Sequence, residues 1–350
     1  AYVYAHMKNS NMNAVYLGGG GLGLGRTYYQ KEDAKNTETL GNYNNYINSL
    51  YGKVDPKTRD LKGPKVIEFE KLIASNLKTV EEQRDAQKRY NPVAVKDLNK
   101  MVKNMDVAKY IQTLGFKADT VIIGELKYYE NLDKIVNEEN LPVIKEYLKF
   151  HVMDDATSYL TKELDELAFD FYGKKLRGQK EQRALDKRGL EFVNGSAGEL
   201  LGKIYVKEYF PAEAKAACEE LVQYLVKSFD QHIKDLAWMS PATKEKALEK
   251  LSKFNVKIGY PDKWKDYSNL QVGSSLIENV KNLQRWSFEE NLAKQGKPVD
   301  KSEWGMTPQT VNAYYSPLFN EIVFPAAILQ PPFYDYKADA AVNFGGIGAV

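Results

Sequence analysis

The side chains with the clearest potential for chemistry lie between Val311 and Tyr315 of the 350-residue sequence. The amide of Asn312 has both a hydrogen-bond donor and an acceptor, so it can pair with the carbonyl and the N–H of another backbone at once. A strand edge can bind an extended peptide by adding it as a further strand. The segment could therefore recognise a peptide backbone without reading its side chains. The alternative is that Asn312 ends a loop and bonds its own backbone, and the residues alone favour this alternative.

A glycine-rich run between Leu17 and Arg26 is the second candidate. Gly18, Gly20 and Gly23 fit the G-x-G-x-x-G pattern of a dinucleotide-binding loop. That function would require a preceding strand, a following helix and an acidic residue about 20 positions further on. The residues after the run show no clear helical apolar stripe. We therefore interpret the run as a flexible or tightly packed loop, with a nucleotide-binding module as the weaker alternative.

Metal-ligating and nucleophilic residues are scarce. The sequence has one cysteine, Cys218, and three histidines, His6, His151 and His232, none of which is close to another in sequence. It therefore has no helical histidine pair for zinc and no cysteine-rich metal site. It also has no G-x-S-x-G segment that would place a serine nucleophile. These residues therefore predict no metal ligand, whereas a serine nucleophile or a carboxylate pair stays open at this point.

Charge and hydropathy argue against two classes of partner. Lys and Arg total 49 and Asp and Glu total 47, so the net charge is +2. A balance so close to zero gives no electrostatic basis for binding nucleic acid. No apolar run approaches the ~18 residues of a membrane span. At roughly 150 residues per domain, the length indicates two domains.

Hydrophobic periodicity predicts a mainly α protein. Helices are expected over 64–90, 95–113, 120–137, 142–172, 180–208 with a break at Asn194–Ser196, 212–238, a segment opened by Ser240 and Pro241, and 274–292. One strand pair is expected, with arms at 310–315 and 321–324. The composition changes near 275–290, which indicates a domain boundary. On the helix over 212–238, Cys218 and Phe229 share one apolar stripe with His232, so we predict that Cys218 is a core residue and His232 a packed core or interface residue.

The segment around Asn312 is one of several motifs along the chain. They are NAYYSP at 312–317, NEIVFPAAILQPPF at 320–333, NFGGIGAV at 343–350, GKPVD at 296–300, WGMTP at 304–308, FYG at 171–173, Arg183, VNG at 193–195, YFPAEAK at 209–215 and KIGYPDKW at 257–264. Together they resemble the neprilysin and endothelin-converting-enzyme family of zinc metallopeptidases. The resemblance covers nearly the whole chain and is weakest over 30–65. Most eukaryotic members are rich in cysteine, so the single cysteine indicates similarity to a bacterial relative.

The resemblance implies a fold of two mainly helical lobes around an internal chamber, with a small β-hairpin at the start of the catalytic lobe. Residues 1–280 would form a capping lobe, incomplete at its N-terminus, that restricts entry to short peptides. Residues 281–350 would begin the catalytic lobe. Asn312 and Ala313 match the pair that binds the substrate backbone in the family, Asn312 through its side-chain amide and Ala313 through its main chain.

The sequence departs from the family at the zinc site. In the family, H-E-x-x-H follows the segment that matches 343–350, whereas this sequence stops at Val350. The zinc ligands and the catalytic glutamate are therefore expected beyond Val350, and none of the three histidines replaces them. The sequence also lacks an initial Met and a polar C-terminal tail, so we expect a piece of a longer polypeptide, cut at both ends.

We therefore expect part of a zinc-dependent endopeptidase that hydrolyses short peptides by metal-activated water. This chain would supply the chamber wall and the substrate-backbone clamp. Its expected partners are short peptides and the remainder of the polypeptide, or a companion chain, that carries the zinc site. The resemblance also implies an extracytoplasmic location in the periplasm, at the cell surface or in the medium. The alternative from another class is a non-catalytic helical domain that binds peptides or other proteins.

Overall fold

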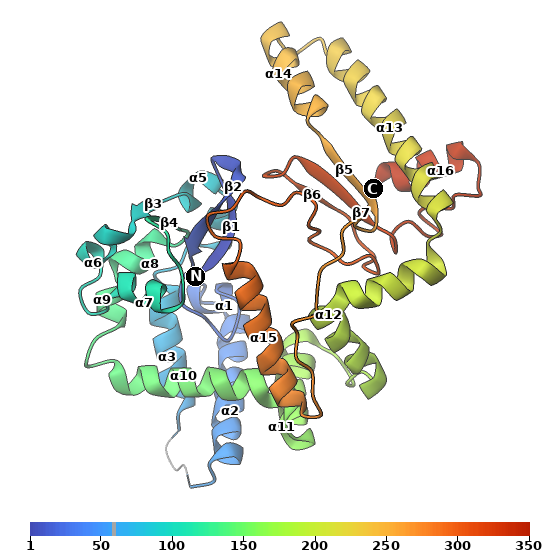
Figure 1. Cartoon of the computed structure of the whole chain (residues 1–350). Coiled ribbons are helices and arrows are strands. Elements are labelled where there is room, and N and C mark those ends of the chain that lie inside the picture. Colours follow the sequence, from blue (N-terminus) through green and yellow to red (C-terminus); the bar gives the residue numbers. More distant parts are fainter. Residues whose placement is uncertain (58–60) are drawn as a thin grey trace. The chain divides into compact units, whose positions relative to one another are not determined.

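The computed structural model describes residues 1–57 and 61–350. It is mainly helical with two small sheets, which confirms the predicted fold class (Figure 1). The chain forms two compact units. One comprises Ala1–Arg183 with Leu270–Val299, and the other comprises Ala184–Asn269 with Asp300–Val350. These units follow from contacts within the chain, and the division into lobes at 1–280 and 281–350 stays a prediction.

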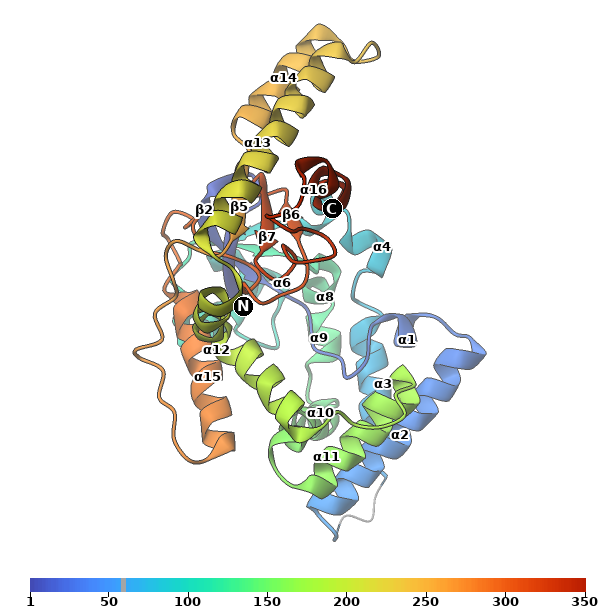
Figure 2. The ribbon, with the colours of Figure 1, turned by 90° about the vertical axis from the view of Figure 1, so that its right-hand side faces the viewer.

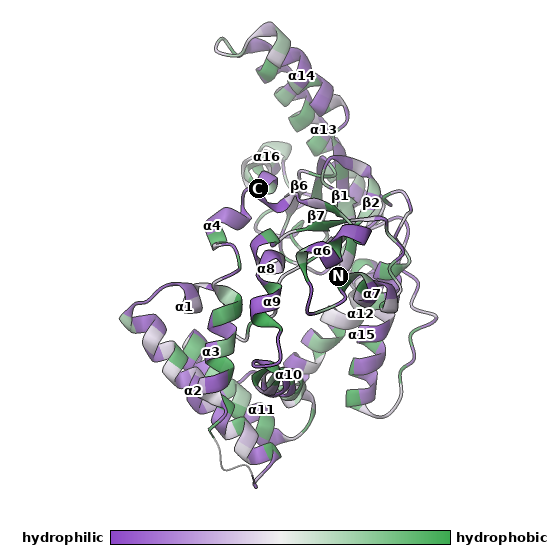
Figure 3. Cartoon of the chain, turned by 90° about the vertical axis from the view of Figure 1, so that its left-hand side faces the viewer, coloured by the Kyte–Doolittle hydropathy of each residue, from purple (hydrophilic) through white to green (hydrophobic). Residues whose placement is uncertain are grey.

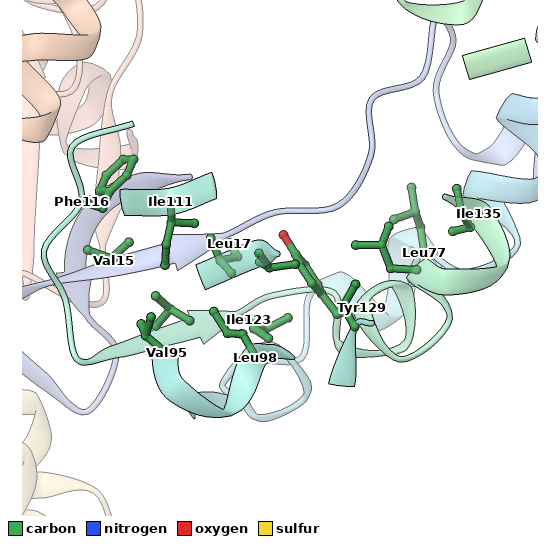
Figure 4. Packing of buried hydrophobic residues seen from close by; sticks show 14 of the residues in the cluster. Val15, Leu17, Leu77, Val95, Leu98, Ile111, Phe116, Ile123, Tyr129 and Ile135 are labelled. Atoms are coloured by element: carbon green, nitrogen blue, oxygen red, sulfur yellow. The ribbon is translucent and has the colours of Figure 1, made fainter. Parts of the chain in front are cut away.

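The first unit contains a four-stranded sheet in the order β1–β2–β4–β3. Its strands are β1 (Tyr2–His6), β2 (Asn9–Leu17), β3 (Pro92–Ala94) and β4 (Thr120–Ile123). β1 and β2 are antiparallel, whereas β2 and β4 are parallel, with Val15 opposite Val121. Figure 4 shows Val15, Leu17 and Ile123 of this sheet among side chains of the surrounding short helices. The sequence analysis did not predict this sheet.

The helices of the first unit differ from the predicted ones, because most are shorter and the helix over Ala34–Val54 was not predicted. They are α1 (Thr27–Gln30), α2 (Ala34–Val54), α3 (Gly63–Ala74), α4 (Val80–Gln83), α5 (Ala86–Arg89), α6 (Leu98–Met101), α7 (Val107–Thr113), α8 (Leu126–Glu130), α9 (Leu132–Ile135), α10 (Leu141–Ala156), α11 (Lys162–Ala168) and α15 (Leu276–Leu292), with 3₁₀ turns at Val95–Asp97 and Thr157–Tyr159 and a π-helix at Phe169–Lys175. Internal capping residues explain the breaks. Thr79, Asp106 and Thr161 each accept a hydrogen bond from a backbone N–H and so begin a new helix inside a predicted one.

The helix predicted over 120–137 is wrong at its start, where β4 lies instead. Val121, Ile122 and Ile123 are buried on the strand between β2 and β3. A short apolar run that is buried on both faces cannot be distinguished from a buried helix by periodicity. Its β-branched residues favour a strand once partner strands are available.

An aromatic cluster joins the long helices of the first unit. α2, α3, α10 and α11 lie close together in Figure 2. The ring of Tyr46 stacks on that of Phe171 with centroids 5.1 Å apart, and Tyr43 meets Phe150 edge to face at 5.8 Å.

None of the helices in the described ranges is both long and apolar enough to span a lipid bilayer.

The second unit combines a helical hairpin with a three-stranded sheet. Its elements are α12 (Leu185–Tyr209), α13 (Ala212–Asp235), α14 (Pro241–Ser252), β5 (Asn255–Gly259), β6 (Tyr314–Ser316), β7 (Glu321–Pro325), α16 (Ala340–Gly346) and a 3₁₀ turn at Ile347–Ala349. The strand order is β5–β7–β6. The predicted hairpin is confirmed, because β6 and β7 are antiparallel, but its first arm begins at Tyr314 rather than at residue 310. β5 was not predicted and pairs with β7 in parallel.

The helices of the second unit follow the predicted stretches with local differences. Within α12 the non-helical backbone lies at Ala197, just after the predicted break at Asn194–Ser196. Cys218 is buried as expected, whereas Phe229 on the same stripe is 63% exposed. His232 is also exposed, so it is not a core residue of this chain, and its role as an interface residue stays a prediction. α13 packs against α14 and β5, and α13 and α14 both carry hydrophilic and hydrophobic residues along their length (Figure 3). These partners do not bury the whole stripe, since Phe229 and His232 are exposed.

Candidate functional site

Asn312 and Ala313 lie directly before β6, at the edge of the three-stranded sheet. β6 pairs with β7, with Tyr314 opposite Val323, and no other strand of the described ranges pairs with its far side. Asn312 is exposed and Ala313 is half-buried. An unpaired strand edge presents N–H and C=O groups to which an extended peptide can add. The two predicted residues are therefore adjacent to an open edge.

The amide of Asn312 is only partly engaged by its own chain. The backbone N–H of Ala313 donates to Asn312 Oδ1 at 2.8 Å, and the backbone N–H of Asn312 donates to the carbonyl of Thr310 at 3.0 Å. The first bond is the one expected from the alternative in which Asn312 bonds the backbone of its own loop. Asn312 Nδ2 donates to no acceptor in the described part of the chain, so the side chain keeps a donor that it can offer to a ligand.

Asparagine side chains elsewhere in this chain bind backbone through both amide atoms. Asn291 accepts from the N–H of Val3 at 2.8 Å and donates to its carbonyl at 2.9 Å. Asn343 accepts from the N–H of Asp335 at 2.9 Å and donates to its carbonyl at 2.7 Å. Asn291 thereby occupies part of the free edge of β1. The same pairing is chemically open to Asn312 if its amide turns from Ala313 N–H toward a bound peptide.

The loop that precedes Asn312 is anchored on several sides. Gln309 Nε2 donates to the carbonyl of Gly198 on α12 at 2.8 Å. The N–H of Gly305 donates to Tyr314 Oη at 2.8 Å. These bonds fix the loop to a helix and to β6 at positions before and after Asn312. A tethered loop loses less conformational freedom when a ligand binds to it.

The motif at 343–348 has a packing role that the sequence analysis did not identify. Asn343 is 6% exposed, and its amide holds the backbone of Asp335. A Cβ atom on Gly346 would lie 2.4 Å from the carbonyl oxygen of Phe333. α16 therefore lies against the segment after β7 with no space for a side chain at Gly346. The sequence shows only an asparagine followed closely by a Gly-Gly pair, and the burial of Asn343 cannot be read from it.

The glycine-rich run is a packed loop in the first unit. A Cβ atom on Gly19 would lie 2.4 Å from Leu77, and one on Gly23 would lie 1.7 Å from Tyr43 Oη. The N–H of Gly23 donates to Glu70 Oε1 at 3.0 Å. The helix that follows, α1, has only four residues. These contacts support the packed-loop interpretation, because protein side chains occupy the space and the amide that a phosphate would need.

A buried polar cluster supports the aromatic core of the first unit. Glu70 is fully buried and accepts hydrogen bonds from Tyr29 Oη at 2.7 Å and from Gly23 N–H, and His151 Nε2 lies 2.9 Å from its Oε1. Asp154 accepts hydrogen bonds from the hydroxyls of Tyr46 and Tyr172. Burial raises the pKa of the Asp154 carboxyl above its ordinary value. The cluster is closed around its own partners and holds the helices together.

The described residues do not fit a zinc ion. They contain no group of three or more His, Cys, Asp or Glu side chains that could hold a metal. His151 is bonded to Glu70, and His6 Nε2 lies 3.3 Å from the hydroxyl of Tyr90. Burial raises the pKa of the Cys218 thiol to about 12, so this side chain is a poor nucleophile and a poor metal ligand. We therefore derive no catalytic step through a metal from these residues.

An apolar cavity in the second unit carries no catalytic groups. It measures about 590 Å³ and lies between α13, α14, the β6–β7 hairpin and the turn at Ile347–Ala349. Its polar lining side chains are Lys250, Tyr315 and Asn320. No carboxylate or histidine is among its lining residues, so the side chains that most often act as general acid or base do not line it.

Comparison with known proteins covers almost the whole chain. The sequence models of peptidase family M13 match residues 1–261 and 312–350. The "Neutral endopeptidase" of Lactococcus lactis subsp. lactis is 33% identical over 348 residues, which are 98% of this chain and 55% of that protein. "Endothelin-converting enzyme 1" of Homo sapiens is 27% identical over 365 residues, which are 100% of this chain and 47% of that protein. The chain thus spans about half the length of the curated relatives it matches.

Solved structures of similar proteins share the fold. Zinc metalloprotease ZMP1 of Mycobacterium tuberculosis in complex with an inhibitor superposes with a TM-score of 0.93 at 35% identity, over 99% of this chain and 53% of that chain. PepO from Lactobacillus rhamnosis superposes with a TM-score of 0.92 at 27% identity, over 99% and 56% respectively. The family predicted from the motifs is therefore confirmed. The chain belongs to peptidase family M13.

Proposed function

We propose that this chain is part of a zinc-dependent endopeptidase of short peptides and contributes its substrate-backbone clamp and part of the chamber wall. The observation that carries the proposal is the position of Asn312 beside the open edge of β6. Family membership and the printed names of the relatives, an endopeptidase and a zinc metalloprotease, support the reaction. Zinc would be bound by the part of the M13 polypeptide that lies outside this chain.

The residues of this chain would act by binding and orientation. An extended peptide would add to β6 as a further strand, which aligns its backbone. Asn312 Nδ2 would donate to a peptide carbonyl, and Asn312 Oδ1 would accept from a peptide N–H in place of Ala313 N–H. The main chain of Ala313 would supply a further backbone contact. Because these bonds involve only backbone groups, side-chain preference would be set elsewhere.

The test is the substitution Asn312→Ala in the full-length enzyme. It removes up to two hydrogen bonds of about 0.5–1.5 kcal/mol each, so kcat/KM for a short peptide should fall roughly 5- to 150-fold. Zinc content should not change, because the amide does not contact the metal in this proposal. Val311→Ala is the matched control, since Val311 is adjacent and 67% exposed. Equal kcat/KM for Asn312→Ala and the control would refute the assignment of Asn312.

The open edge of β6 also favours a second candidate, a non-catalytic peptide-binding domain. A strand edge can capture a peptide without any metal, and the described residues hold no metal site. If this candidate is correct, the 350-residue chain alone should bind a fluorescent extended peptide in the presence of a zinc chelator, and Asn312→Ala should weaken that binding. The absence of binding would exclude it and leave the endopeptidase.

We also propose that the parent protein acts outside the cytoplasm. The support is the family resemblance alone. Fractionation of the native cells with an antibody against the chain is the direct test. Recovery with the cytosolic fraction would refute this location.

A further inference from the structure

A buried ion pair crosses the sheet that carries the open edge. Lys257 on β5 and Glu321 on β7 place Nζ and Oε2 2.7 Å apart, and their side chains are 9% and 2% exposed. Asn255 Nδ2 also donates to Glu321 Oε2 at 3.3 Å. Several other ion pairs of the second unit have at least one partner that is largely exposed, such as Lys253 with Glu249 on α14.

The same ammonium group also binds the loop that leads to Asn312. Lys257 Nζ donates to the carbonyl of Glu303 at 2.7 Å. Glu321 in turn lies opposite Ser316 in the pairing of β7 with β6. A single buried cation therefore connects β5, β7 and the loop before the open edge. At one end of the edge segment, the loop before Asn312 binds Lys257 through the carbonyl of Glu303. At the other end, Ser316 lies opposite Glu321.

The energetics indicate that stability alone does not explain the pair. Two charges removed from water incur a desolvation penalty of several kcal/mol each, and replacing a buried pair by apolar residues of similar volume is often neutral or stabilising. An ammonium group has three hydrogen-bond donors, so it can bind a carboxylate on one segment and a carbonyl on another at the same time. Apolar contacts are non-directional and do not select these partners. What the pair provides over an apolar replacement is a defined position of the loop relative to the sheet.

We propose that Lys257 and Glu321 are positioning residues that hold the edge from Asn312 to Ser316 in the geometry that receives a peptide backbone. This inference rests on the function proposed above, in which that edge binds substrate. Lys257 acts through the carbonyl of Glu303, and Glu321 acts by holding the ammonium group of Lys257 in place. Neither residue contacts the substrate in this account.

The test uses two variants of the full-length enzyme. Lys257→Met alone leaves Glu321 as an unpaired buried charge and can prevent folding. The double variant Lys257→Met/Glu321→Leu removes both charges and should fold. The matched control is Lys253→Met/Glu249→Leu, which removes an exposed pair, 2.8 Å apart, from α14 in the same unit.

Two readouts separate positioning from a general structural role. In the double variant, amide hydrogen exchange over residues 303–316 should become at least roughly tenfold faster, with no change over 1–183, since a lost tether opens the segment locally. KM for a short peptide should rise roughly tenfold while kcat changes less, because the edge would bind ground state and transition state alike. The control variant should change neither quantity.

The outcomes are decisive for the proposal. Exchange over 303–316 as slow as in the control would overturn it. A second result would also overturn it: the double variant exchanges faster but keeps its KM, while Asn312→Ala raises KM. The edge would then bind substrate without the tether. If Asn312→Ala leaves KM unchanged, the proposed function fails separately, and the exchange result alone decides whether the ion pair positions the edge.

Discussion

Substitution of Gly23 by alanine is the sharpest test of the packing in the first unit. The new Cβ atom would lie 1.7 Å from Tyr43 Oη and 2.6 Å from Tyr43 Cζ. Tyr43 is fully buried, and its ring packs against Phe150 and Phe171 with centroids 5.8 and 5.4 Å away. The ring therefore has no free space to move into. The hydroxyl also donates to Glu70 Oε1 at 3.3 Å, and that bond would be lost when the ring moves.

The expected loss of stability follows from these contacts. Overpacking a core costs about 1–3 kcal/mol, and loss of one hydrogen bond adds about 0.5–1.5 kcal/mol. The backbone of Gly23 is not left-handed, so alanine also restricts the unfolded chain and returns about 0.4–1 kcal/mol. We expect Gly23→Ala to lower the free energy of unfolding by roughly 1–4 kcal/mol, measured by urea denaturation with far-UV circular dichroism.

The same glycine run supplies the control. A Cβ atom on Gly18 would have no atom within 4 Å, so Gly18→Ala should change the free energy of unfolding by no more than about 0.5 kcal/mol. Equal stability of the two variants would refute the packed-loop interpretation. The nucleotide-binding alternative would then need a direct binding measurement with NAD or ATP.

Two further predictions concern buried ionisable groups. Burial raises the pKa of the Asp154 carboxyl above 3.8, so the folded state binds the carboxyl proton more tightly than the unfolded state does. The contribution of Asp154 to stability therefore falls as the pH rises from 3.8 through the raised pKa. Asp154→Asn should flatten that fall in a series of urea denaturations between pH 4 and 7, and an unchanged slope would contradict the assignment. The Cys218 thiol, with its pKa raised to about 12 by burial, should react with iodoacetamide at pH 8 only in denaturant, and rapid labelling of the native chain, read by intact mass, would contradict its core position.

Local signals predicted several features of the fold. Ser240 accepts a hydrogen bond from the N–H of Thr243 and Pro241 occupies the first turn of α14, as the Ser-Pro pair predicts. The β6–β7 hairpin was found because its partners are neighbours in sequence. Cys218 was found because the proximal half of α13 has a sheet to pack against.

Features that depend on distant partners were not predicted. Val121 and Ile123 form a strand because β2 lies parallel to them, and that partner lies far earlier in the sequence, with Val15 opposite Val121. His232 shares the stripe of Cys218, yet it is exposed, because the elements that contact α13 do not cover that position. Periodicity records which face of an element is apolar, whereas burial also depends on the partner that covers it.

The motif that resembles the family identified Asn312 as a candidate site residue, whereas the chemistry of the side chain alone supported this only in part. Asn312 has an amide suited to backbone recognition, but its position beside an unpaired strand is a property of the three-stranded sheet. The anchors of its loop, Gln309 and Lys257, form contacts with segments far away in sequence. No local pattern identifies such anchors, because a buried Lys has the same sequence signal as an exposed one.

The central claim is that Asn312 binds substrate through the peptide backbone. The most direct measurement is kcat/KM of the full-length enzyme and of Asn312→Ala for one short peptide and for analogues that each carry a single backbone N-methyl group. N-methylation removes one N–H donor, so at one position it should lower kcat/KM of the wild type by roughly tenfold. We predict that this penalty disappears in Asn312→Ala. Identical penalties in the two enzymes at every position would contradict the account.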